Sequence, residues 1–148
     1  AMFNAARADG FYPVVVSGYR SAEKQQSLVM EKRNEYQAQG YSVSEAQALA
    51  EKWVANPGSS EHQLGIAVDI NPAGDQFTDD SLYQWLKCNS FRYGFILRYP
   101  ADKTDITGTL YEPWHYRYVG KEAAAEICAR GLCLEEYLAE LALRKTST

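Results

Sequence analysis

Residues 60–69 read Ser-Glu-His-Gln-Leu-Gly-Ile-Ala-Val-Asp, and residues 112–115 read Glu-Pro-Trp-His. These two stretches hold both histidines of the chain, His62 and His115, and each histidine has a carboxylate a few residues away. Imidazole nitrogens and carboxylate oxygens form the donor set of catalytic zinc sites, in which three protein ligands leave a fourth position open for water. A carboxylate that is not a ligand can then act as the general base. The pattern therefore predicts a zinc hydrolase.

The spacing inside each stretch explains how these side chains can meet at one site. His62 lies in a predicted loop and Asp69 in the predicted strand that follows, so the chain between them must turn. Gly65 permits that turn, because a residue without Cβ adopts conformations that other residues avoid. In the second stretch Pro113 fixes the backbone, so that Glu112 can point toward the water molecule instead of the metal.

Each of these residues alone has an ordinary structural explanation. A single histidine is more often a surface or core residue than a ligand, Asp69 can stabilise a turn, and Glu112 can be a solvated loop charge. The combination is more specific, because a pattern with five specified positions arises by chance at roughly one start in a million. We therefore interpret the two stretches as one catalytic site.

Length and composition are those of an ordinary globular protein. The 148 residues suffice for a core of their own, with 46% hydrophobic and 23% charged residues. We expect residues 1–148 to form one domain. We also expect this domain to be a fragment of a longer protein, without the upstream anchor or leader. The formal net charge of −4 argues against nucleic-acid binding. No apolar run approaches the roughly 20 residues that a membrane-spanning helix needs.

The three cysteines, Cys88, Cys128 and Cys133, match no zinc-binding spacing, since the chain has no Cys-x-x-Cys pair. Two interpretations stay open for Cys128 and Cys133. They are close enough in sequence to form a disulfide across a helix end in an oxidising compartment, or they are buried free thiols that pack as small apolar residues.

Turn residues and hydrophobic periodicity divide the chain into short strands and helices. The predicted strands are Tyr12–Ser17, Ala67–Ile70, Arg92–Leu97 and Trp114–Tyr118. The predicted helices cover the start to about Asp9, Ala22–Gln39 with Ser21 as N-cap, a segment capped by Ser44 and reaching Trp53, Ser81–Lys87, Lys121–Ala129 and Leu134–Leu143. Residues 59–62 and 100–109 are expected to be loops. Without regular alternation of strand and helix, an α+β fold with a small, mainly antiparallel sheet flanked by helices is favoured.

The pattern S-x-H-x-x-G-x-A-x-D followed by E-P-W-H resembles the LAS zinc metallopeptidases, and among them the VanY-like D-alanyl-D-alanine carboxypeptidases of bacterial cell walls. Three further stretches carry the resemblance: Ser-Gly-Tyr-Arg-Ser at 17–21, Trp-His-Tyr-Arg-Tyr-Val-Gly at 114–120 and Leu-Glu-Glu-Tyr-Leu at 134–138. The likeness runs from about Val14 to Leu138 and implies the LAS/hedgehog-like metallopeptidase fold.

The resemblance also implies roles for individual residues. The zinc ligands that it implies, for one ion, are His62, Asp69 and His115. Glu112 takes the role of general base. Arg20 is expected in the pocket, where it binds the terminal carboxylate of the substrate or polarises the scissile carbonyl, with Gln25 and Ser60 as further substrate-binding residues. The structural alternatives are an ion-pair role for Arg20 and ordinary helix and loop positions for Gln25 and Ser60.

The activity implied by the resemblance is removal of a C-terminal D-alanine from peptidoglycan stem peptides, with D,D or L,D specificity left open. The alternatives are a peptidoglycan endopeptidase or a D,D-dipeptidase of the same superfamily, or a non-catalytic zinc-containing module that binds the cell wall. Endopeptidases of this superfamily often have Asp where Glu112 stands, which counts against that alternative. A structural zinc site is disfavoured because such sites usually fill four positions with Cys and His.

The resemblance further implies an extracytoplasmic protein, in the cell wall or at the cell surface, whose partners are peptidoglycan stem peptides. We expect a monomer with no nucleic-acid partner and no transmembrane segment in this chain.

Overall fold

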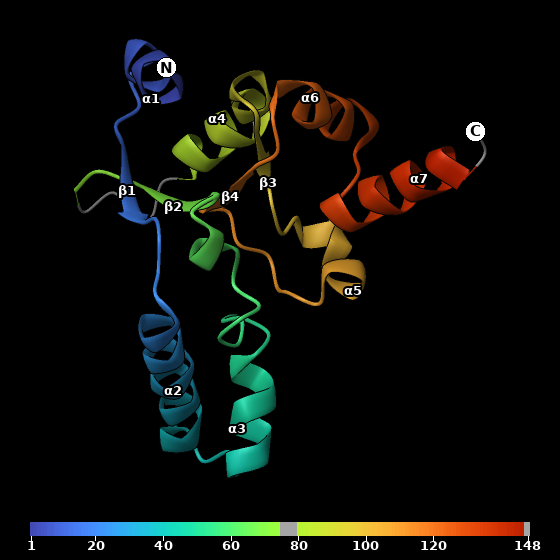
Figure 1. Cartoon of the computed structure of the whole chain (residues 1–148). Helices are drawn as coiled ribbons and strands as arrows, with labels where there is room; N and C mark the ends of the chain where they lie inside the picture. Colours follow the sequence, from blue (N-terminus) through green and yellow to red (C-terminus); the bar gives the residue numbers. More distant parts are fainter. Residues whose placement is uncertain (75–79, 147–148) are drawn as a thin grey trace.

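A four-stranded antiparallel sheet in the order β1-β2-β4-β3 lies at the centre of the molecule, which is a computed structural model that describes residues 1–74 and 80–146 (Figure 1). The strands are β1 (Pro13–Ser17), β2 (Ala67–Pro72), β3 (Phe95–Leu97) and β4 (His115–Tyr118). The two central strands contain the ends of the two motif stretches. Because β2 and β4 pair directly, Asp69 lies opposite His115 in the ladder.

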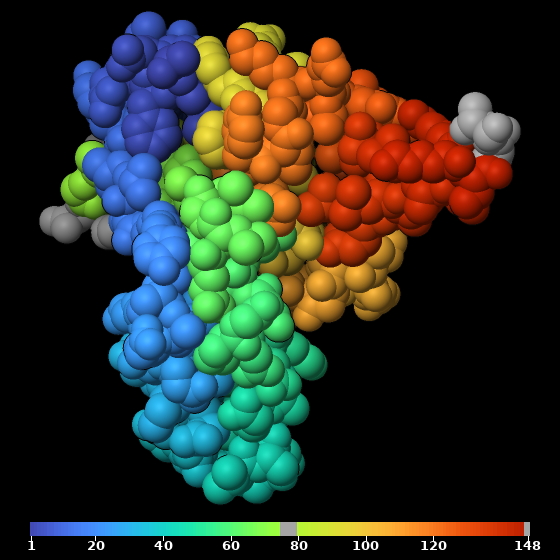
Figure 2. Space-filling view, in the orientation of Figure 1, coloured from blue at the N-terminus to red at the C-terminus, as the bar shows by residue number. Residues whose placement is uncertain are grey.

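Helices cover the sheet on both sides. The α-helices are α1 (Met2–Ala8), α2 (Ala22–Ala38), α3 (Val43–Ala50), α4 (Ser81–Asn89), α5 (Thr104–Thr107), α6 (Lys121–Arg130) and α7 (Leu134–Thr146), and the 3-10 helices are η1 (Glu61–Leu64), η2 (Ser90–Tyr93) and η3 (Ala101–Lys103). Helices α4 and α6 lie on one side of the sheet, whereas η1 and the hairpin of α2 and α3 lie on the other (Figure 1). The hairpin projects from the body as a separate lobe (Figure 2).

The alternation of side chains along the central strands separates the core from the motif residues. Ile70 and Tyr116 are fully buried and pack with Leu86 of α4 in the main apolar cluster. Their neighbours in sequence, Asp69 and His115, point to the opposite face, since successive side chains of a strand alternate between faces. The side chains of Asp69 and His115 therefore lie side by side on the face of the sheet that is turned toward the α2–α3 hairpin.

The predicted α+β fold, with a small antiparallel sheet flanked by helices, is confirmed. The capping role of Ser21 is also confirmed, because its side chain accepts a hydrogen bond from the backbone N–H of Lys24. The prediction that Ser44 caps the next helix is wrong. Ser42 is the N-cap, because its side chain accepts from the backbone N–H of Glu45, while the Glu45 carboxylate accepts from the backbone N–H of Ser42 and completes a capping box. This helix ends at Ala50.

Three further boundaries differ from the expectation. The expected loop at 59–62 runs into η1 from Glu61 onward, and the expected loop at 100–109 contains η3 and α5. The strand expected from Arg92 starts only at Phe95, because Ser90–Tyr93 forms a 3-10 turn that ends at Gly94 with φ of 86°. Short turns of this kind have no hydrophobic periodicity by which a sequence would mark them.

The cysteines are free thiols, so the disulfide alternative for Cys128 and Cys133 is not realised. Cys133 is buried, as the thiol alternative expects, but Cys128 is exposed. Among the residues that the structure describes, no helix combines the length and the apolar character needed to cross a bilayer.

Candidate active site

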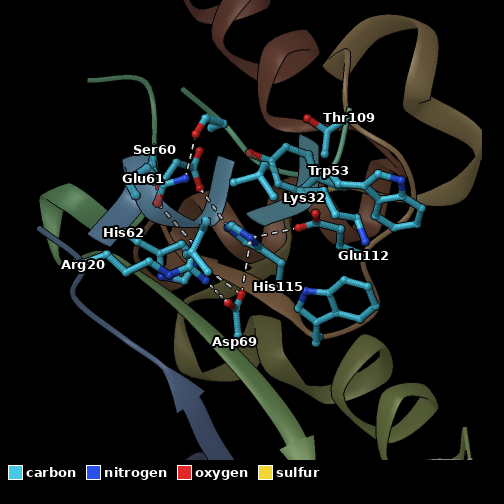
Figure 3. Close-up of a pocket in the computed structure, with 16 residues that line it drawn as sticks. Arg20, Lys32, Trp53, Ser60, Glu61, His62, Asp69, Thr109, Glu112 and His115 are labelled. Carbon is cyan, nitrogen blue, oxygen red and sulfur yellow. Dashed lines mark hydrogen bonds and ion pairs between the residues drawn. The ribbon is translucent and has the colours of Figure 1, made fainter. Parts of the chain in front are cut away.

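His62, Asp69 and His115 converge on one point, and all three are buried (Figure 3). Each offers one ligand atom, and these atoms lie within 4.8 Å of one another. Oδ1 of Asp69 is 3.2 Å from Nε2 of His62 and 3.5 Å from Nδ1 of His115. Three donor atoms so close together, without an apolar side chain between them, have the arrangement of a metal centre.

Local folding explains how His62 comes to face the strand residues. His62 lies in η1, which ends at Gly65 in the left-handed conformation with φ of 68°, as the sequence predicts for the turn into β2. The backbone N–H of Arg20 donates to the carbonyl of His62 at 3.1 Å, so the segment after β1 fixes η1 in place. The site thus depends on contacts between three separated parts of the chain.

In each candidate ligand, the side-chain polar atom that does not face the centre lies next to a neighbouring group. Nδ1 of His62 donates to the carbonyl of Gly18 at 2.7 Å, because a carbonyl can only accept, and this tautomer leaves Nε2 available as a ligand. Oδ2 of Asp69 accepts from Arg20, which leaves Oδ1. Nε2 of His115 faces a carboxylate oxygen of Glu61 at 3.5 Å, so Nδ1 is the nitrogen turned toward Oδ1 of Asp69, with Oε2 of Glu112 at 3.1 Å beside it. Outer partners of this kind orient metal ligands in proteins.

The burial of the donor atoms tests whether a metal fits here. Nε2 of His62 and Oδ1 of Asp69 are buried and have no hydrogen-bond partner among the described residues. Buried polar atoms without a partner destabilise a fold by roughly 1–3 kcal/mol each. A cation between them would satisfy both, and two imidazoles with one carboxylate are a donor set that suits zinc. The residues present fit a zinc ion.

Glu112 lies beside this centre and is only 5% exposed. Its Oε2 is 3.1 Å from Nδ1 of His115, and its backbone carbonyl accepts from the N–H of His115 in the turn that Pro113 forms. Burial raises the pKa of Glu112 above its ordinary value. Burial opposes the charged form of His115, yet the surrounding carboxylates, with Glu112 foremost, raise its pKa to about 9. A buried carboxylate with a raised pKa, next to a metal centre, suits proton transfer.

A cavity of about 360 Å³ opens over the centre, between the sheet and the α2–α3 hairpin. It brings together all the site residues that the sequence predicts: Arg20, Gln25, Ser60, His62, Asp69, Glu112 and His115. One wall consists of Trp53 and Trp114, whose rings stack with centroids 6.5 Å apart. Lys32 of α2 adds a positive charge to the lining (Figure 3). The cavity therefore combines an aromatic wall with polar groups.

Arg20 has the ion-pair contact that was its structural alternative, and it also lines the cavity. Its Nε donates to Oγ of Ser17 at 2.7 Å, Nη2 donates to Asp69, and Nη1 donates to Oε1 of Gln25 at 3.4 Å. Gln25 is buried and its Nε2 donates to the carbonyl of Ala55 at 2.7 Å, which ties α2 to the segment after α3. Ser60 is buried next to η1.

Sequence reasoning missed Glu61, Arg98 and Tyr99. Glu61 occupies the unspecified position between the serine and histidine of the motif, where its Oε1 accepts from Arg98 and from Arg117. Burial opposes its ionisation, but His115 and the two guanidinium groups lower the pKa of Glu61 to about 2. The ring of Tyr99 lies edge-on to that of His115, and burial raises the pKa of Tyr99 to about 12. Only its place beside His62 could have drawn attention to Glu61.

Comparison with known proteins supports the interpretation of this site as a metal centre. The family model for VanY, described as D-alanyl-D-alanine carboxypeptidase, matches residues 1–121. A D-alanyl-D-alanine carboxypeptidase of Enterococcus faecalis is 63% identical over 137 residues, which cover 93% of this chain and 51% of that protein. The chain spans about half the length of this curated relative.

Two solved structures extend the comparison to the fold. A crystal structure of a variant of the vancomycin resistance D,D-pentapeptidase VanY in complex with Zn(II) superimposes with a TM-score of 0.90 at 63% identity, covering 93% of this chain and 77% of that one. The LdcB LD-carboxypeptidase gives a TM-score of 0.77 at 40% identity, covering 93% and 63%. On these grounds, the chain belongs to the VanY family of D-alanyl-D-alanine carboxypeptidases.

Proposed function

We propose that this chain is the catalytic part of a zinc-dependent carboxypeptidase that removes a C-terminal D-alanine from peptidoglycan stem peptides. The observation that carries the proposal is the convergence of three buried donor atoms beside Glu112 in one cavity. The name of the 63% identical relative and the Zn(II) in the related VanY structure support it. Because peptidoglycan lies outside the cytoplasmic membrane, the proposal includes an extracytoplasmic site of action.

The residues that would hold the ion are His62 through Nε2, Asp69 through Oδ1 and His115 through Nδ1, the atoms that face one another. When bound, zinc supplies a Lewis acid that polarises the scissile carbonyl and lowers the pKa of a water molecule to about 7. The remaining chemistry belongs to the side chains of the protein.

Glu112 would accept the proton of the attacking water and later deliver it to the leaving amine. Its Oε2 already lies 3.1 Å from a proposed ligand, so it is within reach of a water molecule at the centre. The burial that raises its pKa makes the carboxylate a better base than an exposed glutamate. One residue would thus serve as base and then as acid.

Arg20 would bind the terminal carboxylate of the substrate. Three of its five N–H groups contact Ser17, Gln25 and Asp69, which holds the guanidinium in a fixed orientation and leaves two donors for a ligand. Gln25 and Ser60 would add polar contacts in the same cavity. A peptide that continued beyond this point would bring no carboxylate to the two remaining donors, which gives a preference for a free C-terminus a physical cause.

Mass spectrometry of defined stem peptides, after incubation with the zinc-loaded protein, tests the proposal. One peptide ends in D-Ala-D-Ala and the other in a single D-Ala after the diamino acid, and the free dipeptide D-Ala-D-Ala is the third substrate. The Glu112→Gln variant is the control for contaminating activity. Loss of one alanine from the pentapeptide indicates D,D specificity, and loss from the tetrapeptide indicates L,D specificity. Internal cleavage would identify an endopeptidase, hydrolysis of free D-Ala-D-Ala a dipeptidase, and zinc binding without any cleavage a binding module.

A further inference from the structure

A continuous chain of ion pairs connects helix α7 to His115. Both oxygens of Glu135, near the start of α7, accept from Arg98, at 3.0 Å and 2.6 Å. Nε of Arg98 donates to Oε1 of Glu61 at 2.6 Å, and Oε2 of Glu61 faces Nε2 of His115 at 3.5 Å. Figure 3 shows Glu61 and Glu112 approaching the ring of His115 from different sides.

Most of the side chains in this series of ion pairs are removed from solvent. Side-chain exposure is 10% for Arg98 and 10% for Glu61, and the guanidinium of Arg98 lies 4.7 Å from the ring centroid of Tyr99. Buried charges require well-formed partners because their desolvation is unfavourable. The paired bonds between Arg98 and Glu135 satisfy that requirement, since a guanidinium and a carboxylate match in a fixed geometry. The position of Glu61 is therefore strongly restrained.

With Nδ1 of His115 as the proposed ligand atom, Glu61 is the group that would accept the proton carried by the other ring nitrogen. Oε2 of Glu61 and Nε2 of His115 are both buried, and neither has another hydrogen-bond partner in the part of the chain that the structure describes. Carboxylates face both nitrogens of the ring, since Oε2 of Glu112 lies 3.1 Å from Nδ1. An ion bound through Nδ1 would exclude a proton there, so the proton then belongs on Nε2, where Oε2 of Glu61 accepts it. Nδ1, which faces Asp69 and Glu112, would then offer its lone pair to the ion.

We propose that Glu61 is a positioning residue that fixes the tautomer and orientation of His115, and that Glu135 of α7 restrains Glu61 through Arg98. The inference rests on the proposed role of His115 as a zinc ligand. Glu135 lies outside residues 1–121, the range that the family model matches, so the link to α7 does not follow from that match.

Packing of α7 does not depend on this ion pair alone. Leu134, the first residue of α7, is buried in an apolar cluster with Ile96, Ala124 and Ile127. A Glu135→Gln variant should therefore fold, and any effect on the metal site can be separated from loss of the helix. Glu140→Gln is the matched control, because Glu140 also lies on α7 and pairs with Arg130. Within the described residues, this pair is not part of the ion pairs of Arg98 and Glu61.

Glu61→Gln tests the tautomer directly. Arg98 and Arg117 both donate to Oε1, so the amide oxygen of a glutamine would face them and its NH₂ group would face Nε2 of His115. That nitrogen would then have to accept, and the proton would move to Nδ1, the nitrogen proposed to bind the ion. The substitution keeps the size of the side chain, but it removes the negative charge that pairs with Arg98 and Arg117 and replaces an acceptor at His115 by a donor.

The experiment measures zinc affinity by chelator competition for wild type, Glu61→Gln, Glu135→Gln and Glu140→Gln, together with melting temperature, kcat, KM and the visible spectrum of the cobalt-substituted proteins. We expect a loss of zinc affinity of roughly 10- to 100-fold for Glu61→Gln, a several-fold loss for Glu135→Gln and none for Glu140→Gln. The cobalt spectrum should change for Glu61→Gln, and kcat should fall more than KM rises.

Wild-type zinc affinity and cobalt spectrum in a folded Glu61→Gln variant would overturn the positioning role. Equal affinities for Glu135→Gln and Glu140→Gln would overturn the link to α7, and this comparison also decides the inference if Glu61→Gln does not fold. Zinc binding by wild type without peptide cleavage would contradict the proposed function but leave the affinity comparison valid. A wild-type chain that binds no zinc would contradict both.

Discussion

Asp69 shows how one side chain can serve the fold and the site together. Its backbone lies opposite His115 in the central ladder, which brings two candidate ligands onto one face of the sheet. Its two carboxylate oxygens have separate functions, since Oδ2 accepts from Arg20 while Oδ1 faces both histidines. At this scale, the chemistry depends on which atom of each residue is left available.

The role of Glu112 gives the sharpest prediction at the residue scale. Glu112→Gln keeps the size of the side chain but cannot accept a proton, so we expect kcat to fall by about 10²- to 10⁴-fold. Zinc binding should remain largely intact, because none of the three proposed ligand atoms belongs to Glu112. Alanine release from stem peptides and metal stoichiometry measure the two effects.

The matched control for this substitution is Glu122→Gln, because Glu122 is exposed on α6 and lies outside the cavity. It should leave both alanine release and zinc content unchanged. Near-wild-type activity in Glu112→Gln would show that another group accepts the proton.

At the scale of elements, the start of α3 is determined by a reciprocal capping box. Ser42→Ala removes the side-chain acceptor for the N–H of Glu45, so we expect the melting temperature to fall by roughly 2–5 °C. Ser44→Ala is the control, because its Oγ contacts Oγ of Ser42 at 3.3 Å, whereas the backbone N–H of Glu45 bonds to Ser42. Differential scanning calorimetry compares the two, and an equal or larger loss for Ser44→Ala would contradict the assignment of the cap.

The turn between η2 and β3 depends on Gly94. A Cβ at this position would lie 2.6 Å from Cε2 of Tyr118 and 3.1 Å from the backbone of Gly120, and φ is 86°. We expect Gly94→Ala to destabilise the fold by about 2–4 kcal/mol, since it combines a clash with backbone strain. Urea denaturation measures the free energy of unfolding.

Gly58→Ala separates the two contributions. Gly58 has a similar φ of 89°, but a Cβ there would meet no atom within 4 Å. We expect a loss of about 1 kcal/mol from backbone strain alone. Equal losses of unfolding free energy at both positions would mean that the contact with Tyr118 does not affect stability.

At the scale of the whole molecule, the candidate metal centre joins segments that the fold brings together from distant parts of the sequence. The apolar clusters around Ile70 and Ile96 contain none of the proposed ligands, so we expect the metal-free protein to fold. Zinc should stabilise it, by about 4 kcal/mol when the ion is present at 1,000 times its dissociation constant. A chelator should reverse this rise in melting temperature.

The control for metal removal is His62→Ala, which deletes one proposed ligand atom from the centre. Its melting temperature should respond far less to zinc or to a chelator. A wild-type melting temperature that is insensitive to both would mean that the centre does not hold zinc.

The sequence alone predicted the antiparallel α+β architecture and seven of the residues that gather in the cavity. Local signals suffice for this, because alternation marks Ala67–Ile70 and Trp114–Tyr118 as strands, and Gly65 marks the turn between His62 and β2. The predicted ligand roles themselves await the metal measurements above. The local sequence therefore supplies the metal-donor residues, at a spacing that allows them to form one site.

Only the tertiary structure decided which atoms face the centre and what fixes them. The register of β2 against β4, the hydrogen bond from His62 to Gly18, and the ion pairs of Glu61 join residues from distant parts of the chain. Such contacts have no period or local spacing by which a sequence could reveal them, since they form when separate elements pack. The chain thus encodes its chemical groups locally, whereas their orientation comes from long-range packing.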